Sequence, residues 1–317
     1  MKNVALAVLL VLSIALTACA ATTATPTAAP TSAPTLAPTA ALTADQVIVL
    51  GDIDSQPTDQ IERWQLLADY LGANLKEFGI SAGTVQVAPD METMGSWLVA
   101  GEVDLTFESI YPAMLQVTRF GSSPLLRQWK GGDAEYASII FTRADSGVQT
   151  LADLRGQRLA FEQPSSTTAF FLPTVALIDA GLQPVALQQP DDSFPADAVG
   201  YLFSESDTNT IQWVISGKVV AGATSNQDYR DIPAETRQQL RVLYETPPVP
   251  RQLVLTRAGM APQLRERIAD LLIALGDQPE GARIREAFEE TARFDALPAA
   301  AQTEIQRFQE LQARLEP

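Results

Sequence analysis

The side chains best suited to hold an anion are four consecutive hydroxyls, Ser165 to Thr168. They stand between a strand expected at 158–162 and a helix expected at 167–180. The first amides of a helix have no partner inside it and lie at the positive end of its dipole, so hydroxyls there can complete an uncharged pocket for an oxyanion. Plain helix capping, which needs only one Ser or Thr, is the alternative interpretation.

Three further polar segments also follow expected strands, and ligands of open α/β sheets bind beyond the carboxyl ends of strands. Asp207 and Asp228 could face a ligand's ammonium, although Asp207 is better explained as a helix cap. Tyr111 could equally be a core residue with a hydrogen-bonded hydroxyl. The candidate ligand contacts are Glu108, Tyr111, Ser166, Thr167, Thr168, Asp207, Asn209 and Gln227.

The absence of histidine, with Cys19 as the single cysteine, removes most routine catalytic sites. Ser-His-Asp catalysis, Cys-His catalysis and histidine-based zinc sites all need residues that the chain does not have. We therefore expect binding without turnover and predict no metal and no cofactor. An enzyme that uses carboxylates such as Glu108, Asp207 and Asp228 remains an alternative, because paired acids can perform glycoside or metal-assisted chemistry.

The charge of the chain is strongly negative. Its formal net charge is -16, and removing a leader that contains Lys2 would make it -17. Nucleic-acid binding requires clustered Lys and Arg that displace counterions, so we predict no nucleic-acid partner. The same charge argues against attraction to anionic lipid.

The first 44 residues are typical of an exported lipoprotein. The apolar run from Val4 to Leu16 is too short to span a bilayer, and it ends in Leu16-Thr-Ala-Cys19, which resembles the lipobox of bacterial lipoproteins. The resemblance implies a signal peptide at 1–18 and a lipid on Cys19. Residues 20–44 are almost all Ala, Thr, Pro and Ser, so 19–44 is expected to be an anchor followed by an unfolded tether. The expected location is extracytoplasmic, on the cell membrane.

From residue 45 onward, expected strands alternate with expected helices. Strands are predicted at 47–50, 85–87 and 103–107, and helices at 61–78 and 91–100, with Gly79 ending the first helix. Such alternation predicts an α/β fold with mostly parallel sheets that are flanked by helices.

The pattern repeats after residue 145, which predicts two lobes. Trp97-Leu-Val-Ala-Gly101-Glu-Val103 has an echo in Trp213-Val-Ile-Ser-Gly217-Lys-Val219, and both predict a helix that ends at glycine and leads into a strand. Strand-like runs at 136–142 and 252–256 suggest two crossings between the lobes. We predict lobe 1 at 45–137, lobe 2 at 138–250, and a return to lobe 1 at 251–317 with two apolar-striped helices.

Several segments together have a family-specific order and spacing. They are 64–71, 101–105, 136–138, 145–148, 151–156 and 160–168, with Tyr111 after the second. This arrangement resembles the phosphate/phosphite/phosphonate substrate-binding proteins of ABC importers. The resemblance implies a two-lobed periplasmic-binding-protein fold of type 2 that closes over its ligand.

The resemblance also assigns roles at the expected site. Ser166, Thr167 and Thr168 match a Ser-Thr-Ser triplet that hydrogen-bonds phosphonate oxygens, and Tyr111 matches a tyrosine that lines the cleft. Asp207 stands where many members have histidine, and Gln227 where aminophosphonate binders have an acid. A carboxylate beside a phosphonate repels it unless it is protonated or paired.

The function expected from the sequence is capture of a small oxyanion of the phosphonate, phosphate or phosphite type, followed by delivery to an ABC permease. Closure of the two lobes would bury the ligand. One alternative keeps the fold but makes the protein a ligand sensor, for example of another polar or zwitterionic solute.

Overall fold

The computed structural model describes residues 46–54 and 57–315. The predictions for 1–44, namely the signal peptide, the lipid on Cys19 and the tether, lie outside these residues. Within the described part, no helix combines the length and the apolar character needed to cross a membrane.

The first of two six-stranded sheets has the order β14-β4-β13-β3-β1-β2. Its parallel strands are β1 (Gln46–Ile53), β2 (Ile80–Ala88) and β3 (Leu105–Glu108). Its antiparallel part contains β4 (Ser123–Gln128), β13 (Gln252–Thr256) and β14 (Phe294–Asp295). The sheet therefore combines chain segments from both ends of the sequence.

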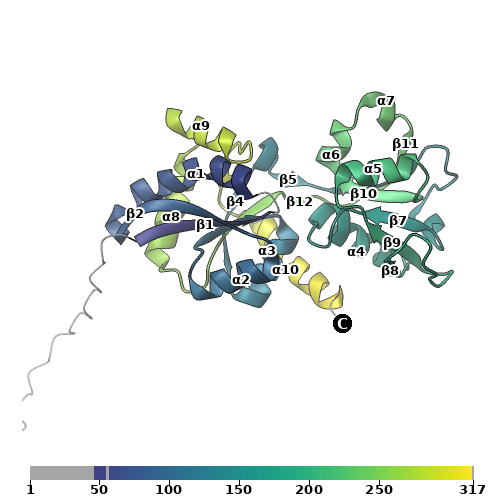
Figure 1. The fold of residues 1–317 in the computed structure, drawn as a ribbon, viewed down its shortest axis with the longest axis horizontal. Coiled ribbons are helices and arrows are strands. Elements are labelled where there is room, and N and C mark those ends of the chain that lie inside the picture. Colours follow the sequence, from purple (N-terminus) through teal and green to yellow (C-terminus); the bar gives the residue numbers. More distant parts are fainter. Residues whose placement is uncertain (1–45, 55–56, 316–317) are drawn as a thin grey trace, which may run out of the picture. The chain divides into compact units, whose positions relative to one another are not determined.

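The second sheet has the order β11-β6-β10-β7-β9-β8. Parallel pairing joins β7 (Arg158–Phe161), β8 (Pro184–Ala186), β9 (Val199–Phe203) and β10 (Ala221–Ser225). Antiparallel pairing adds β6 (Ser138–Arg143) and β11 (Leu240–Glu245). The short strands β5 (Glu135–Tyr136) and β12 (Val249–Pro250) pair with each other, where the chain leaves the first sheet and where it returns (Figure 1).

The two sheets share one arrangement. In each, three parallel strands (β3-β1-β2 and β10-β7-β9) adjoin an antiparallel strand, β13 or β6. The echo between Trp97 and Trp213 marks equivalent places: Gly101 and Gly217 have left-handed φ values of 75° and 76°, and the amides of Val103 and Val219 donate to the two tryptophan carbonyls. A left-handed residue at a helix end favours glycine, so the predicted helix ends are confirmed in both lobes. The strands that follow begin at Leu105 and Ala221, two residues later than predicted.

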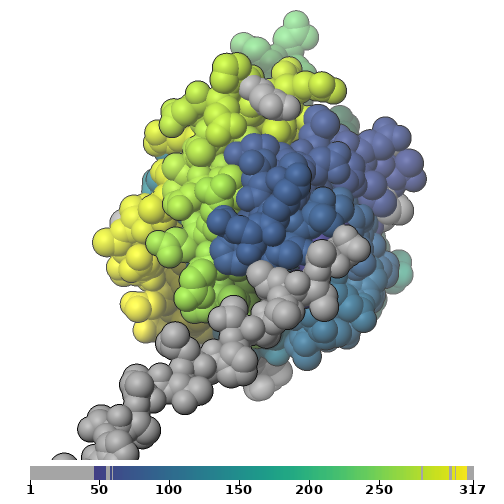
Figure 2. All heavy atoms as spheres, turned by 90° about the vertical axis from the view of Figure 1, so that its left-hand side faces the viewer, coloured from purple at the N-terminus to yellow at the C-terminus, as the bar shows by residue number. Residues whose placement is uncertain are grey.

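Helices from both ends of the sequence accompany the first sheet. They are α1 (Pro57–Asn74), α2 (Met91–Ala100), α3 (Ile110–Phe120), α8 (Pro262–Ala274), α9 (Pro279–Ala287) and the C-terminal helix α10 (Ala299–Leu315). The second sheet is accompanied by α4 (Leu172–Asp179), α5 (Asp207–Ile215), α6 (Asn226–Asp231) and α7 (Ala234–Arg237). Figure 2 shows the green and yellow C-terminal segments beside the blue N-terminal ones, and α8 and α9 both contact α1. The two apolar-striped helices predicted near the C-terminus are α8 and α10.

The apolar stripe of α1 fills the core of the first sheet. Trp64, Leu67 and Leu71 are fully buried, and Trp64 meets the ring of Phe107 edge-on at 5.3 Å. Gly83 in β2 allows α1 to approach closely, because a Cβ there would lie 1.8 Å from the carbonyl oxygen of Ala68. One prediction was too long: α1 ends at Asn74, and residues 76–78 form a separate 3-10 turn before Gly79.

Candidate functional site

A cavity of about 830 Å³ is lined by segments that follow parallel strands of both sheets. From the first sheet come residues after β1, β2 and β3, and from the second come residues after β7, β9 and β10. This placement agrees with the rule that ligands bind beyond the carboxyl ends of strands. The lining residues used below are Asp52, Glu108, Ser109, Lys130, Tyr136, Glu162, Ser166, Thr167, Thr168, Asp207, Asp228, Arg251 and Glu289.

The hydroxyl run begins a helix, and its members have different partners. Ser166 is the N-cap, and its hydroxyl accepts from the amide of Ala169 at 3.1 Å. Residues 167–171 form one π-helical turn that continues into α4, where the expectation was a regular helix. π-Helical turns are rare and occur frequently at functional sites.

Thr167 connects the two sheets. Its hydroxyl oxygen accepts from the backbone N–H of Tyr111 at 3.0 Å and donates to the hydroxyl of Ser109, also at 3.0 Å. Tyr136 lies within hydrogen-bonding reach of both hydroxyls. Thr167 is only 2% exposed, so this small polar cluster is shielded from water where the hydroxyl run meets the end of β3.

Carboxylates from the second sheet surround the hydroxyl run. Burial raises the pKa of Glu162 to about 7, and the neighbouring charge of Asp207 adds to this rise. Burial also raises the pKa of Asp207, although the hydroxyl of Thr224 donates to it at 2.5 Å and opposes the shift. The prediction that Asp207 caps α5 is wrong, because the hydroxyl of Ser206 accepts from the amide of Asn209 and is the cap.

A second group of carboxylates lies at the first sheet. Burial raises the pKa of Glu108 to about 8, and the charge of Asp52 adds to this rise. Burial and the charge of Glu289 raise the pKa of Asp52 to about 6. The side-chain amide of Gln116 donates to the Glu108 carboxyl at 3.1 Å.

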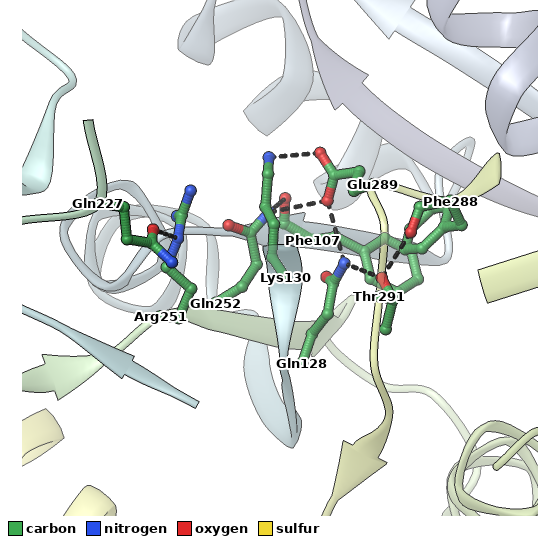
Figure 3. A network of polar contacts seen from close by, with 9 residues as sticks. All are labelled: Phe107, Gln128, Lys130, Gln227, Arg251, Gln252, Phe288, Glu289 and Thr291. Carbon is green, nitrogen blue, oxygen red and sulfur yellow. Dashed lines mark hydrogen bonds and ion pairs between the residues drawn. The ribbon is translucent and has the colours of Figure 1, made fainter. Parts of the chain in front are cut away.

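Glu289 reaches the cavity from the segment that follows α9 (Figure 3). Lys130 Nζ contacts its Oε1 at 2.5 Å, and the side-chain amide of Gln128 donates to its Oε2 at 3.0 Å. Its backbone has a φ of 57°, a left-handed value that is uncommon for a residue with a side chain. The contacts with Lys130 and Gln128 hold the carboxylate against the cavity wall.

Arg251 is the other cation among the described residues of the lining. Its Nε donates to the side-chain oxygen of Gln227 at 2.7 Å, and its guanidinium lies 4.6 Å from the centre of the Tyr136 ring. Both lining cations thus already have partners on the protein. The lining carboxylates outnumber them by nine to two: Asp52, Asp54, Asp90, Glu108, Glu162, Glu205, Asp207, Asp228 and Glu289.

Five of the eight residues predicted to contact ligand line the cavity, namely Glu108, Ser166, Thr167, Thr168 and Asp207. The other three have contacts beside it. The ring of Tyr111 stacks on Phe171 with centroids 4.3 Å apart, Asn209 donates to the carbonyl of Ser204, and Gln227 donates to Asp133 at 2.6 Å. Ligand contact by each of the eight stays a prediction.

The lining residues that sequence reasoning missed include Asp52, Tyr136, Glu162 and Glu289. Asp52 stands near the end of the first strand, so the rule used for the other loops would have found it. Glu162 was placed inside a strand, although β7 ends at Phe161. No sequence signal marks Glu289, because its position depends on how the C-terminal segment packs.

No group of three or more Asp, Glu, His or Cys in the described ranges is arranged to hold a metal ion. The described groups that line the cavity include hydroxyls, carboxyls and the cations Lys130 and Arg251. These groups can bind a polar solute.

Two comparisons with known proteins concern most of the chain. The family model described as "ABC transporter, phosphonate, periplasmic substrate-binding protein" matches residues 53–301. XAC2383 from Xanthomonas citri is 32% identical, with a TM-score of 0.80 over 85% of this chain and 98% of that one. Its structures are described as bound to chloride ion and bound to ATP.

Two further relatives are less similar to this chain or match a smaller part of it. PhnD1 from Prochlorococcus marinus, solved in complex with methylphosphonate, is 19% identical with a TM-score of 0.60, over 85% of this chain and 98% of that one, and shares the fold. The phosphate-import protein PhnD of Mycolicibacterium smegmatis is 32% identical over 111 residues, which are 34% of each chain. The match thus spans about a third of that curated relative.

The fold expected from the sequence, two mostly parallel sheets flanked by helices, is confirmed by the observed topology and by these solved structures. The family model covers well over half of the chain. The chain therefore belongs to the phosphonate periplasmic substrate-binding protein family of ABC transporters.

Proposed function

We propose that this protein captures a small solute in the cavity between its two sheets and delivers it to an ABC permease. The observation that carries the proposal is the cavity of about 830 Å³, whose wall comes from the strand ends of both sheets. A ligand that touches both walls favours the conformation in which they approach, so binding and lobe closure are coupled. The family supplies the expectation of transport without turnover.

We propose further that an oxyanion end of the ligand, of the phosphonate, phosphate or phosphite type, binds at Ser166, Thr167 and Thr168. The cap of the π-helical turn places hydroxyls at the start of a helix, where free amides and the helix dipole favour negative charge. Hydrogen bonds from several neutral donors can hold an anion without a nearby cation.

The charge of the cavity favours a zwitterionic ligand over a bare oxyanion. Nine carboxylates and two cations line the cavity, and Lys130 and Arg251 are already paired within the protein. An ammonium group beside the carboxylates would relieve their mutual repulsion, whereas a bare dianion would increase it. An aminoalkylphosphonate carries both required charges.

A thermal-shift series tests this ligand assignment. Methylphosphonate, phosphate, phosphite, sulfate and 2-aminoethylphosphonate differ in charge but have similar tetrahedral ends. A ligand that binds only the folded protein stabilises it by about 2.7 kcal/mol at a hundred times its Kd. We expect 2-aminoethylphosphonate to raise Tm most. A larger rise with phosphate or methylphosphonate would contradict the zwitterion assignment, and no rise with any compound would contradict the oxyanion assignment.

Membrane anchoring is proposed from the sequence around Cys19. Replacing Cys19 with Ser should release the protein from membranes or block its processing, because the residue that carries the lipid would be missing. Membrane fractionation with detection of the mature chain measures this, and Ser13→Ala in the same leader is a suitable control. Normal cleavage and membrane retention of the Cys19→Ser protein would contradict the anchor.

A further inference from the structure

The C-terminal helix α10 packs against both lobes at once. Phe308 and Leu311 are 1% and 8% exposed, and they belong to an apolar cluster that contains residues of α3, β13, α4 and the paired strands β5 and β12. In this cluster Ile110 and Leu253 come from the first lobe, and Leu172 comes from the second. Alone among the described core clusters, this one draws its residues from both lobes and from the connecting strands.

Three aromatic rings form the centre of this cluster. Phe171, from the π-helical turn of the second lobe, stacks on Tyr111 of α3 at 4.3 Å and on Phe308 of α10 at 5.1 Å. The interplanar angles are 19° and 24°, so the three rings lie nearly parallel. Stacked pairs contribute about 0.5–1.5 kcal/mol beyond the burial of their area, which makes the stack a definite contact between lobes.

The ring stack is connected to the π-helical turn, the proposed ligand contact, through a short stretch of backbone. Phe171 is the last residue of the turn that starts at Thr167, and its amide donates to the carbonyl of Ser166. At the other end of that turn, Thr167 bonds to Ser109 and to the amide of Tyr111. A shift of Phe308 would therefore move both Phe171 and the hydroxyls that face the cavity.

Helix α10 is fixed to the first lobe independently of this stack. It contacts α3, and the side-chain amide of Gln312 donates to the Thr118 hydroxyl at 3.4 Å. It also contacts β12, one of the two connecting strands. Among the α10 side chains that the structure describes, none lines the cavity.

We propose that α10 is a brace: through Phe308 it sets the angle between the two lobes and thereby the affinity of the cavity, without touching the ligand. Phe308 is a positioning residue in this account. Apparent affinity scales with the fraction of molecules whose lobes are already arranged for binding, so a change in lobe angle changes Kd even when every ligand contact is preserved.

The test measures the distance between the lobes directly. In a chain with Cys19→Ser, the changes Val99→Cys on α2 and Glu235→Cys on α7 introduce two exposed thiols as the only cysteines. Spin labels on them report the distribution of distances between lobes by pulsed electron resonance. Phe308→Leu keeps an apolar side chain but removes the ring, and we expect it to shift or widen the distribution by more than about 2 Å.

Ile268→Ala is the matched control, because Ile268 is fully buried on α8 but packs only in the core of the first sheet. It should leave the distribution unchanged while lowering stability. If Phe308→Leu gives the parent distribution, or if both variants shift it equally, α10 is not a brace.

The predicted change in ligand affinity rests on the proposed function, whereas the predicted change in the distance between the lobes does not. With 2-aminoethylphosphonate, Phe308→Leu should change Kd about threefold or more, and Ile268→Ala should not. An unchanged Kd for Phe308→Leu would overturn the link to affinity. If the compound fails to bind the parent protein, the ligand assignment fails, and the distance measurement still decides the brace.

Discussion

Replacing Glu108 with Gln is expected to raise the free energy of unfolding of the ligand-free protein by about 2–4 kcal/mol at pH 8. Burial and the charge of Asp52 raise the pKa of Glu108 from 4.5 to about 8. At a pH where Glu108 ionises freely in the unfolded chain but keeps its proton in the folded protein, each unit of raised pKa lowers stability by about 1.4 kcal/mol. Gln keeps the shape and stays neutral, so the variant avoids this loss.

The sign of the pH dependence follows from the same carboxyls. Between about pH 4.5 and pH 8 the folded protein binds more protons than the unfolded chain at Glu108, and the raised pKa values of Glu162, about 7, and Asp52, about 6, act in the same direction. Stability should therefore increase as the pH falls from 8 toward 4.5. Below that range Glu108→Gln should match the parent, because Glu108 is then protonated in both states.

Chemical unfolding at several pH values measures this effect. Glu92→Gln is the matched control, since the Glu92 side chain is 76% exposed and its pairing with Arg119 is a surface contact. Equal stability of the Glu108→Gln protein and the parent at pH 8 would show that Glu108 is not buried as an acid with a raised pKa.

Replacing Thr167 with Val should weaken ligand binding by about ten- to a hundredfold. Val preserves the shape of the side chain but removes the hydroxyl that the ligand's oxyanion is proposed to use. A polar group left without a partner in a buried site costs about 1–3 kcal/mol, and 1.4 kcal/mol is tenfold in affinity. Titration calorimetry on the variant and the parent gives the ratio.

Ser166→Ala measures the stability cost of losing the helix cap in the ligand-free protein. The hydroxyl of Ser166 is the cap, whereas Thr167 bonds to Ser109 and Tyr111. Loss of a cap costs about 1 kcal/mol of stability, so Ser166→Ala should lower Tm. If Thr167→Val also melts early but binds as tightly as the parent, its hydroxyl serves only to join the lobes, and the ligand contact must be sought elsewhere.

The elements with strong local signals could be predicted from the sequence. The apolar stripe of α1 and the glycines at 101 and 217 each fix a local backbone geometry, and the structure contains the helices and turns they imply. Such features depend on neighbouring residues alone, so periodicity and turn chemistry reveal them.

Features set by tertiary packing could not be predicted. The sequence pattern at 167–171 is that of an ordinary helix. The extra residue of the π-helical turn is accommodated through contacts with α3 and Phe308, which the local sequence does not show. Strand β14 has only two residues, too few for any periodic pattern. Glu289 enters the site only because the chain after α9 returns to the first sheet.

The acidity of the cavity could be predicted from the sequence only in part. Asp207 and Glu108 were recognised as candidates, but the sequence does not show that Asp52 and Glu289 lie close enough to raise the pKa of Glu108. Charge repulsion between residues far apart in the chain becomes apparent only when the fold brings them together. The sequence therefore suggested an ammonium partner only for Asp207 and Asp228, and the contribution of Asp52 and Glu289 to an acidic cavity could not be predicted.

A crystal structure of the protein with 2-aminoethylphosphonate tests the central claim most directly. The account predicts the compound in the cavity between the sheets, with its phosphonate oxygens on Ser166, Thr167 and Thr168 and its ammonium group toward the carboxylates. A compound bound outside the cavity, or bound there with its phosphonate away from this run, would contradict the account.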